Sequence, residues 1–139
     1  PVKALQPKSR TIRYDNMKSA MAEEGILAQA LREPALLDHC VNLTPSQFSV
    51  ELLGRVFGQL QARHQKGMEV SLGVLEDVSP EEASHLAGIC HRNTGPVNED
   101  AFLDCIKIVR QESEKRNSRT DDDLLAMRNK LKESKGTKV

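Results

Sequence analysis

The sequence lacks tryptophan, and aromatic residues of all kinds make up only 3% of its 139 positions. Its core must therefore be built from leucine, isoleucine, valine, alanine and methionine, which favours helical packing. No apolar run approaches the roughly 18 residues that a membrane span needs. The N-terminus has no apolar signal core either, so we expect a cytoplasmic chain with no membrane partner. It begins without methionine in loop-like sequence, as a segment of a longer protein would.

Motifs for catalysis are also missing. The chain has no G-x-S-x-G turn, no phosphate-binding loop and no dinucleotide-binding glycine pattern. Cys90 and His91 are adjacent on a predicted helix, where side chains one residue apart point about 100° away from each other, so they cannot act as nucleophile and base. We therefore predict that this chain is not itself an enzyme, with no catalytic residue and no cofactor-binding residue.

Histidine and cysteine are present, but their spacing does not fit a metal site. The odd number of cysteines (Cys40, Cys90 and Cys105) rules out pairing of all three and fits a reducing compartment. His39 next to Cys40 supplies the right ligand types for zinc, as do His85, Cys90 and His91, yet the chain lacks the paired spacing of zinc fingers. The three aspartates 121–123 suit a helix N-terminus, where acidic side chains are favourable. No metal site is predicted.

Charge is segregated along the chain although its net value is zero. Residues 1–16 hold four basic residues and one acid, residues 110–139 hold nine basic residues and six acids, and the middle holds seven basic residues and thirteen acids. An acidic body is a poor match for a nucleic-acid-binding domain, and no aromatic residues lie among the C-terminal lysines and arginines for base stacking. We expect no direct nucleic-acid partner, although contact by the basic C-terminal segment stays open.

Helical spacing of apolar residues predicts an all-α fold: a bundle of about six helices over residues 17–109, preceded by a linker over 1–16. Met21 is expected on the apolar face of the first helix, which ends before Pro34. Local signals mark the other helices. They are a Ser49 cap for a helix over 50–66, Gly67 after its end, a Ser71 cap for a short helix within 68–75, the helix start Ser79-Pro80-Glu81-Glu82, and an Asn98 cap for the last bundle helix. The stretch 68–75 could also form a strand, but no partner strand is expected elsewhere.

The C-terminal segment is the most unusual part. No aliphatic or aromatic side chain occurs from Arg110 to Asp123, and then leucines return at helical spacing. A turn at residues 117–120 would make a helical hairpin over 110–136, the C-terminal arm, followed by a tail over 137–139. Paired in this way, Leu124 and Leu125 lack an apolar partner, which is expected of interface anchors. The predicted partner-binding residues are Arg116, Arg119, Leu124, Leu125, Met127, Arg128 and Leu131.

Several stretches resemble the C-terminal domain of bacterial DnaG-type primase. They are Met21-Ala-Glu-Glu-Gly-Ile-Leu-Ala-Gln-Ala-Leu-Arg-Glu-Pro34, Phe48, Leu52-Leu53-Gly-Arg-Val-Phe57 with the loop at Gly67, and the closing stretch from Leu124 to Gly136. The resemblance covers about residues 17–136 through soft hydrophobic patterns. It implies a non-catalytic helicase-binding domain, a bundle followed by a hairpin, that recruits primase to the hexameric DnaB-type helicase during DNA replication. The parent's zinc-binding and polymerase domains, with their magnesium, would lie upstream.

Two alternatives remain open. The N-terminal domain of a DnaB-type helicase is similar in fold and opens with a comparable helix before a proline, but it would continue into an ATPase domain. The lysine-rich C-terminal tail of this chain suits the end of a primase better. An unrelated helical adaptor or DNA-binding module is the other alternative. Self-association with a second copy through the hairpin is also left open.

Overall fold

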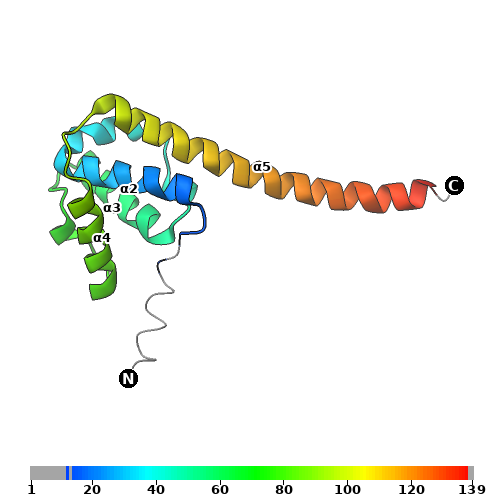
Figure 1. Cartoon of the computed structure of the whole chain (residues 1–139), viewed down its shortest axis with the longest axis horizontal. Coiled ribbons are helices and arrows are strands. Elements are labelled where there is room, and N and C mark those ends of the chain that lie inside the picture. Colours follow the sequence, from blue (N-terminus) through cyan, green and yellow to red (C-terminus); the bar gives the residue numbers. More distant parts are fainter. Residues whose placement is uncertain (1–11, 13, 138–139) are drawn as a thin grey trace, which may run out of the picture.

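The computed structural model describes residue 12 and residues 14–137, with side chains described as far as residue 118. In these residues the fold is all-α (Figure 1). The α-helices are α2 (Met17–Arg32), α3 (Glu51–Gln65), α4 (Pro80–Arg92) and α5 (Glu99–Thr137), and the short 3-10 helices are η2 (Pro34–Cys40), η3 (Pro45–Gln47) and η4 (Leu72–Val74). The predicted all-α class is therefore confirmed, whereas the predicted count of about six bundle helices is not.

Helix α2 is the centre of the body, which we define as the packed elements α2 to α4 together with residues 99–116 of α5. It packs most extensively against α5, and the two helices run antiparallel, since Gln29 lies near Asn98 and Asn16 lies near Glu112 (Figure 1). Ile26, Leu27 and Ala30 on α2 are fully buried. Met21, expected on the same apolar face, is instead 54% exposed, because it lies on the outer side of α2.

Helix α3 begins differently from the prediction. The expected cap Ser49 does not cap it; Val50 occupies the N-cap position and makes no side-chain cap hydrogen bond. The buried carboxylate of Glu23 on α2 instead accepts hydrogen bonds from the backbone N–H groups of Ser49 and Val50. The predicted helix end is confirmed, because Gly67 follows it with a left-handed φ of 69°.

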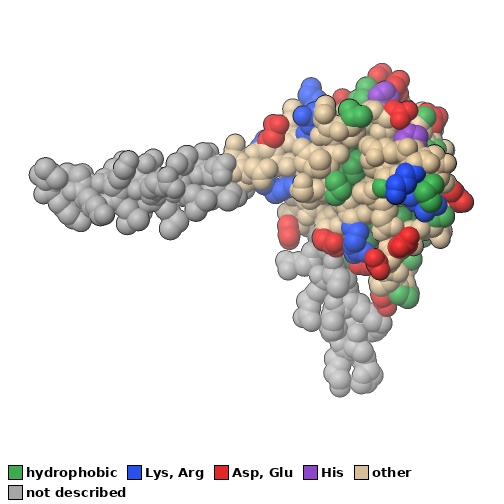
Figure 2. Space-filling model, turned by 180° about the vertical axis from the view of Figure 1, so that it is seen from behind, with side chains coloured by type: hydrophobic (Ala, Val, Ile, Leu, Met, Phe, Trp, Pro, Cys, Tyr) green, Lys and Arg blue, Asp and Glu red, His purple; other side chains and the backbone are tan. Residues whose placement is uncertain are grey.

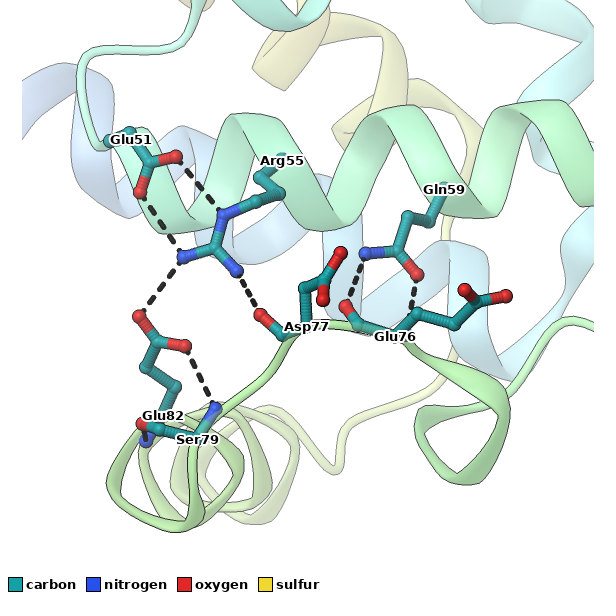
Figure 3. A network of polar contacts seen from close by, with 7 residues as sticks. All are labelled: Glu51, Arg55, Gln59, Glu76, Asp77, Ser79 and Glu82. Atoms are coloured by element: carbon teal, nitrogen blue, oxygen red, sulfur yellow. Dashed lines mark hydrogen bonds and ion pairs between the residues drawn. The ribbon is translucent and has the colours of Figure 1, made fainter.

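The segment between α3 and α4 is held against α3 by polar contacts (Figure 3). Arg55 pairs with Glu51 and with Glu82, and it also donates to the carbonyl of Asp77. Gln59 exchanges two hydrogen bonds with the backbone of Glu76. These contacts hold α4 beside α3 through side-chain geometry as well as apolar packing.

Of the three other predicted caps, two are confirmed and one, like Ser49, is wrong. Ser79 and Glu82 form a complete capping box at the start of α4, and Asn98 accepts a hydrogen bond from the N–H of Ala101 at the start of α5. Ser71 precedes η4 but makes no side-chain cap hydrogen bond; its hydroxyl donates to Glu69 instead. A three-residue 3-10 helix, Leu72–Val74, takes the place of the short helix predicted within 68–75.

The predicted hairpin is not formed. Helix α5 is continuous through residues 117–120 and extends away from the body (Figure 1), so the expected turn and separate last helix are replaced by one long helix. The physical reason is that no proline lies between Pro96 and the C-terminus, and asparagine, serine and threonine lower helix propensity by only about 0.7 kcal/mol each at most. Polar residues alone do not break a helix.

Candidate interaction surface

The face of α5 that packs on the body changes from apolar to polar toward the point where the helix leaves the body. Phe102, Ile106 and Val109 are buried against the core, and one turn later Glu112 and Ser113 are buried as well. The sequence prediction placed the last bundle residue at position 109, whereas contacts with the body extend further along α5. The helical period of the sequence could have shown this, because it places positions 102, 106, 109, 113 and 116 on one face of α5.

Glu112 is the centre of a charged cluster at this exit. One carboxylate oxygen accepts a hydrogen bond from the Asn16 amide at 3.1 Å, and the other lies 3.2 Å from the Lys115 ammonium and 3.7 Å from that of Lys18. The hydrogen bond from Asn16 lowers the pKa of Glu112 below its ordinary value, and the hydrogen bond from Lys115 adds to this effect. The carboxylate is therefore charged at neutral pH and ties α5 to the start of α2.

Arg116, one turn further along α5, makes a second polar contact with the body. Its guanidinium donates to the carbonyl of Gln47 at the end of η3, with a distance of 2.9 Å. The side chain is half-buried. Arg116 was predicted to bind a partner; the structure places it at the inner end of the C-terminal segment, where it contacts the body.

The remaining predicted partner-binding residues lie outside the described side chains. They are Arg119, Leu124, Leu125, Met127, Arg128 and Leu131, and only the helical backbone at these positions is described. Their roles therefore stay predictions.

The outward side of α5 borders an open hollow of about 460 Å³. Leu103 is 41% exposed in this hollow. Val41, which follows η2, is 75% exposed but does not line the hollow. The opposite view of the molecule shows acidic and basic side chains interspersed over the body (Figure 2). The residues that line the hollow are His39, Leu103, Ile106, Lys107, Arg110, Gln111 and Glu114.

A second polar cluster fixes the segment that leads into α2. The hydroxyl of Tyr14 donates to the buried Glu24 carboxylate at 2.6 Å and lies 2.8 Å from Nε2 of His85. Because this hydroxyl has a single proton, Nε2 of neutral His85 must carry a hydrogen and donate to the tyrosine oxygen. Arg92 also contacts Glu24, at 3.3 Å. Tyr14 was assigned to the linker by sequence, yet it packs against the core.

The histidines and cysteines considered as metal ligands have other roles. His39 pairs with Glu99 at 2.6 Å, His85 contacts Tyr14, and Cys40 is buried. Burial raises the pKa of the Cys40 thiol to about 12 and also raises the pKa values of Cys90 and Cys105, which disfavours their thiolates. Among the described side chains, no three histidine, cysteine or acidic groups are placed to hold a metal ion. Asp121, Asp122 and Asp123 lie outside them.

Comparisons of the chain with models of protein families, with characterised proteins and with solved structures found no match. Among the described helices, none contains an apolar stretch of the length that crossing a bilayer requires.

Proposed function

We propose that this chain is the helicase-binding domain of a bacterial DnaG-type primase. In this role it binds the hexameric DnaB-type helicase in the cytoplasm and so recruits primase for RNA primer synthesis. The domain is non-catalytic and has no cofactor of its own, whereas the parent protein would be a DNA-directed RNA polymerase that uses magnesium and zinc in its upstream domains. The sequence resemblance over residues 17–136 is the basis of this proposal.

The observation that carries the proposal furthest is the long helix α5. Its inner half is anchored in the body through Val109, Glu112 and Arg116, and its outer half, residues 117–137, extends away from the body (Figure 1). A helix that continues past its own core offers little to the stability of its own domain, since most helical stability in proteins comes from tertiary packing. Such a segment suits docking on another protein.

Charge supports a protein partner over a nucleic acid. Residues 17–109 hold thirteen acids and only seven basic residues, and a body with this net negative charge would repel a phosphate backbone. The outer half of α5 holds five basic residues and four acids, so it lacks the strong positive charge of a nucleic-acid-binding helix. It suits a protein surface with a polar rim around an apolar centre, with Leu124 and Leu125 as the apolar anchors.

Direct binding tests the proposal. The chain is mixed with the purified hexameric replicative helicase of the same organism, and association is measured by calorimetry and by the change in ATPase rate. We expect a complex at micromolar concentrations. No association at those concentrations contradicts the proposal, and association with a primase C-terminal domain instead would favour the helicase alternative.

The anchor assignment is tested separately with a matched pair of variants. Replacing both Leu124 and Leu125 with serine is expected to weaken helicase binding at least tenfold, about 1.4 kcal/mol or more. Leu103→Ser is the control, because it removes an exposed leucine from the inner half of the same helix. Equal effects of the two changes, or none, would show that the anchor lies elsewhere.

A further inference from the structure

The Asn16 side chain makes two contacts, which join the start of α2 to the part of α5 that leaves the body. Its Oδ1 accepts a hydrogen bond from the N–H of Ser19 at 3.1 Å and thereby caps α2, while its Nδ2 donates to Glu112 of α5 at 3.1 Å. Asn16 is also the last residue before α2 begins. The chain segment that leads into the body is therefore bonded directly to the helix that leaves it.

The charge of Glu112 strengthens this bond. Its carboxylate is buried and is balanced by Asn16, Lys18 and Lys115. If α5 moved away from α2, the charge would lose its hydrogen-bond donor and the Lys18 contact together. A hydrogen bond to a charged group is stronger than one between neutral groups, so the loss of this contact is unfavourable.

A second contact, to a different element, constrains the helix further. Arg116 lies one turn beyond Glu112 and donates to the Gln47 carbonyl at the end of η3. Apolar packing of Phe102, Ile106 and Val109 places the inner part of α5 on the body, and the polar contacts at Glu112 and Arg116 extend this attachment toward the outer half. Two contacts one turn apart, to α2 and to η3, also fix its direction.

We propose that these four residues (Asn16, Gln47, Glu112 and Arg116), here called the exit clamp, are positioning residues that set the direction in which the outer half of α5 is presented to its partner. The identity of that partner rests on the proposed function, whereas the clamp itself does not. Because Asn16 belongs to the clamp, a change in the chain segment before α2 is transmitted to the direction of α5.

The sharpest test changes the chemistry of Asn16 and keeps its cap. In Asn16→Asp the side chain can still accept the Ser19 N–H, since aspartate caps helices as well as asparagine does. It loses the amide donor, however, and brings a second carboxylate against Glu112. Asn98→Asp is the matched control, because Asn98 caps α5 in the same way through the N–H of Ala101 and lies at the far end of the body.

A double variant provides the rescue. In Asn16→Asp combined with Glu112→Gln, the new amide at position 112 can donate to the new carboxylate at position 16. The hydrogen bond returns with donor and acceptor exchanged. A role in general stability alone would not predict this recovery of direction.

The readout is the distribution of distances between two spin labels, measured by pulsed electron paramagnetic resonance on the full chain. The labels are attached to cysteines introduced at Glu33 on the body and Asn129 on α5, in a background with Cys40, Cys90 and Cys105 replaced by alanine. We expect Asn16→Asp to broaden the distribution, Asn98→Asp to leave it unchanged and the double variant to narrow it again. Helicase affinity should fall severalfold in Asn16→Asp and recover in the double variant.

An unchanged distribution in Asn16→Asp, or equal broadening in Asn98→Asp, overturns the proposal. If Asn16→Asp unfolds the body, as circular dichroism would show, Arg116→Met removes the second contact independently and should broaden the distribution by itself; a narrow distribution there also overturns it. Failure of the proposed function is recognised separately: the spin-label results would hold while the unmodified chain failed to bind helicase.

Discussion

The backbone N–H and the hydroxyl of Ser49 both donate to a single carboxylate oxygen of Glu23, at distances of 2.8 and 2.5 Å. The same oxygen also accepts from the hydroxyl of Ser19, and the other oxygen accepts from the N–H of Val50. Glu23 is fully buried. A side chain of α2 thus satisfies the backbone donors at the start of α3, so the two helices are joined by a charge-assisted network as well as by apolar contact.

Glu23→Gln should destabilise the body. The amide can present its oxygen to one side of this network only, so its NH₂ group must face a donor on the other side. We expect a loss of about 1–3 kcal/mol in the free energy of unfolding, the usual cost of leaving a buried donor without an acceptor. Urea denaturation followed by circular dichroism measures it. Glu33→Gln, an exposed glutamate at the end of the same helix, is the control and should change little.

Gly54→Ala should destabilise the chain although alanine is the better helix former. A Cβ at position 54 would lie 2.5 Å from the carbonyl oxygen of Pro45, which is backbone and cannot move aside easily. Gly88 lies within α4, and a Cβ there would meet only the flexible end of Arg92, at 3.4 Å. Gly88→Ala should therefore stabilise by about 0.5–1 kcal/mol. Thermal unfolding of the two variants should shift in opposite directions, and a shift in the same direction contradicts the close approach at Gly54.

Ser79→Ala should cost about 1 kcal/mol, because it removes the hydroxyl that accepts the N–H of Glu82 at the start of α4. Ser71→Ala is the informative comparison. Ser71 also precedes a helical turn, but its hydroxyl donates to Glu69 and caps nothing. Chemical denaturation should resolve the difference, and equal losses would argue that the capping box contributes little.

Stability should fall below neutral pH, in part because of His85. Burial lowers the pKa of His85 and Arg92 lowers it further, while Glu24 acts in the opposite direction. The folded state therefore favours the neutral ring. The contribution of His85 to the free energy of unfolding is present above the pKa of about 6.5 that histidine has in the unfolded chain. This contribution is lost as the pH falls from there through the lower pKa of His85 in the folded chain.

His85→Gln checks this sign, since glutamine can still donate to Tyr14 but does not titrate. The loss of unfolding free energy between pH 7.5 and 5.5 should be smaller in this variant than in the unmodified chain. His91→Gln, at an exposed position on the same helix, should retain the full loss. A pH dependence in His85→Gln equal to that of the unmodified chain would assign the effect to other groups.

Local signals in the sequence predicted much of the helix pattern. Pro34, Gly67 and the Ser79-Pro80 start were found correctly because each acts through its own backbone or its immediate neighbours. Ser49 was misread for the opposite reason: the group that binds its N–H comes from Glu23, far away in the sequence. No local pattern distinguishes a serine that caps a helix from one that donates to a distant carboxylate.

The candidate surface was predicted less completely than the fold. The polar run from Arg110 to Asp123 marked an unusual segment, but it did not indicate that Glu112 is buried. Its burial depends on Asn16, Lys18 and Lys115, and two of these come from the other end of the chain. A charged residue in a polar run gives no sign of such partners.

By itself, the sequence determined that the chain is helical and where several of its helices begin or end, because propensity, capping and periodicity act over a few residues. The tertiary structure decided that α5 continues through residues 117–120 and that its exit is held by Asn16 and Gln47. A turn in a polar segment forms only where packing favours it over helix, and contacts between residues about 70 to 100 positions apart depend on how the helices are arranged in space.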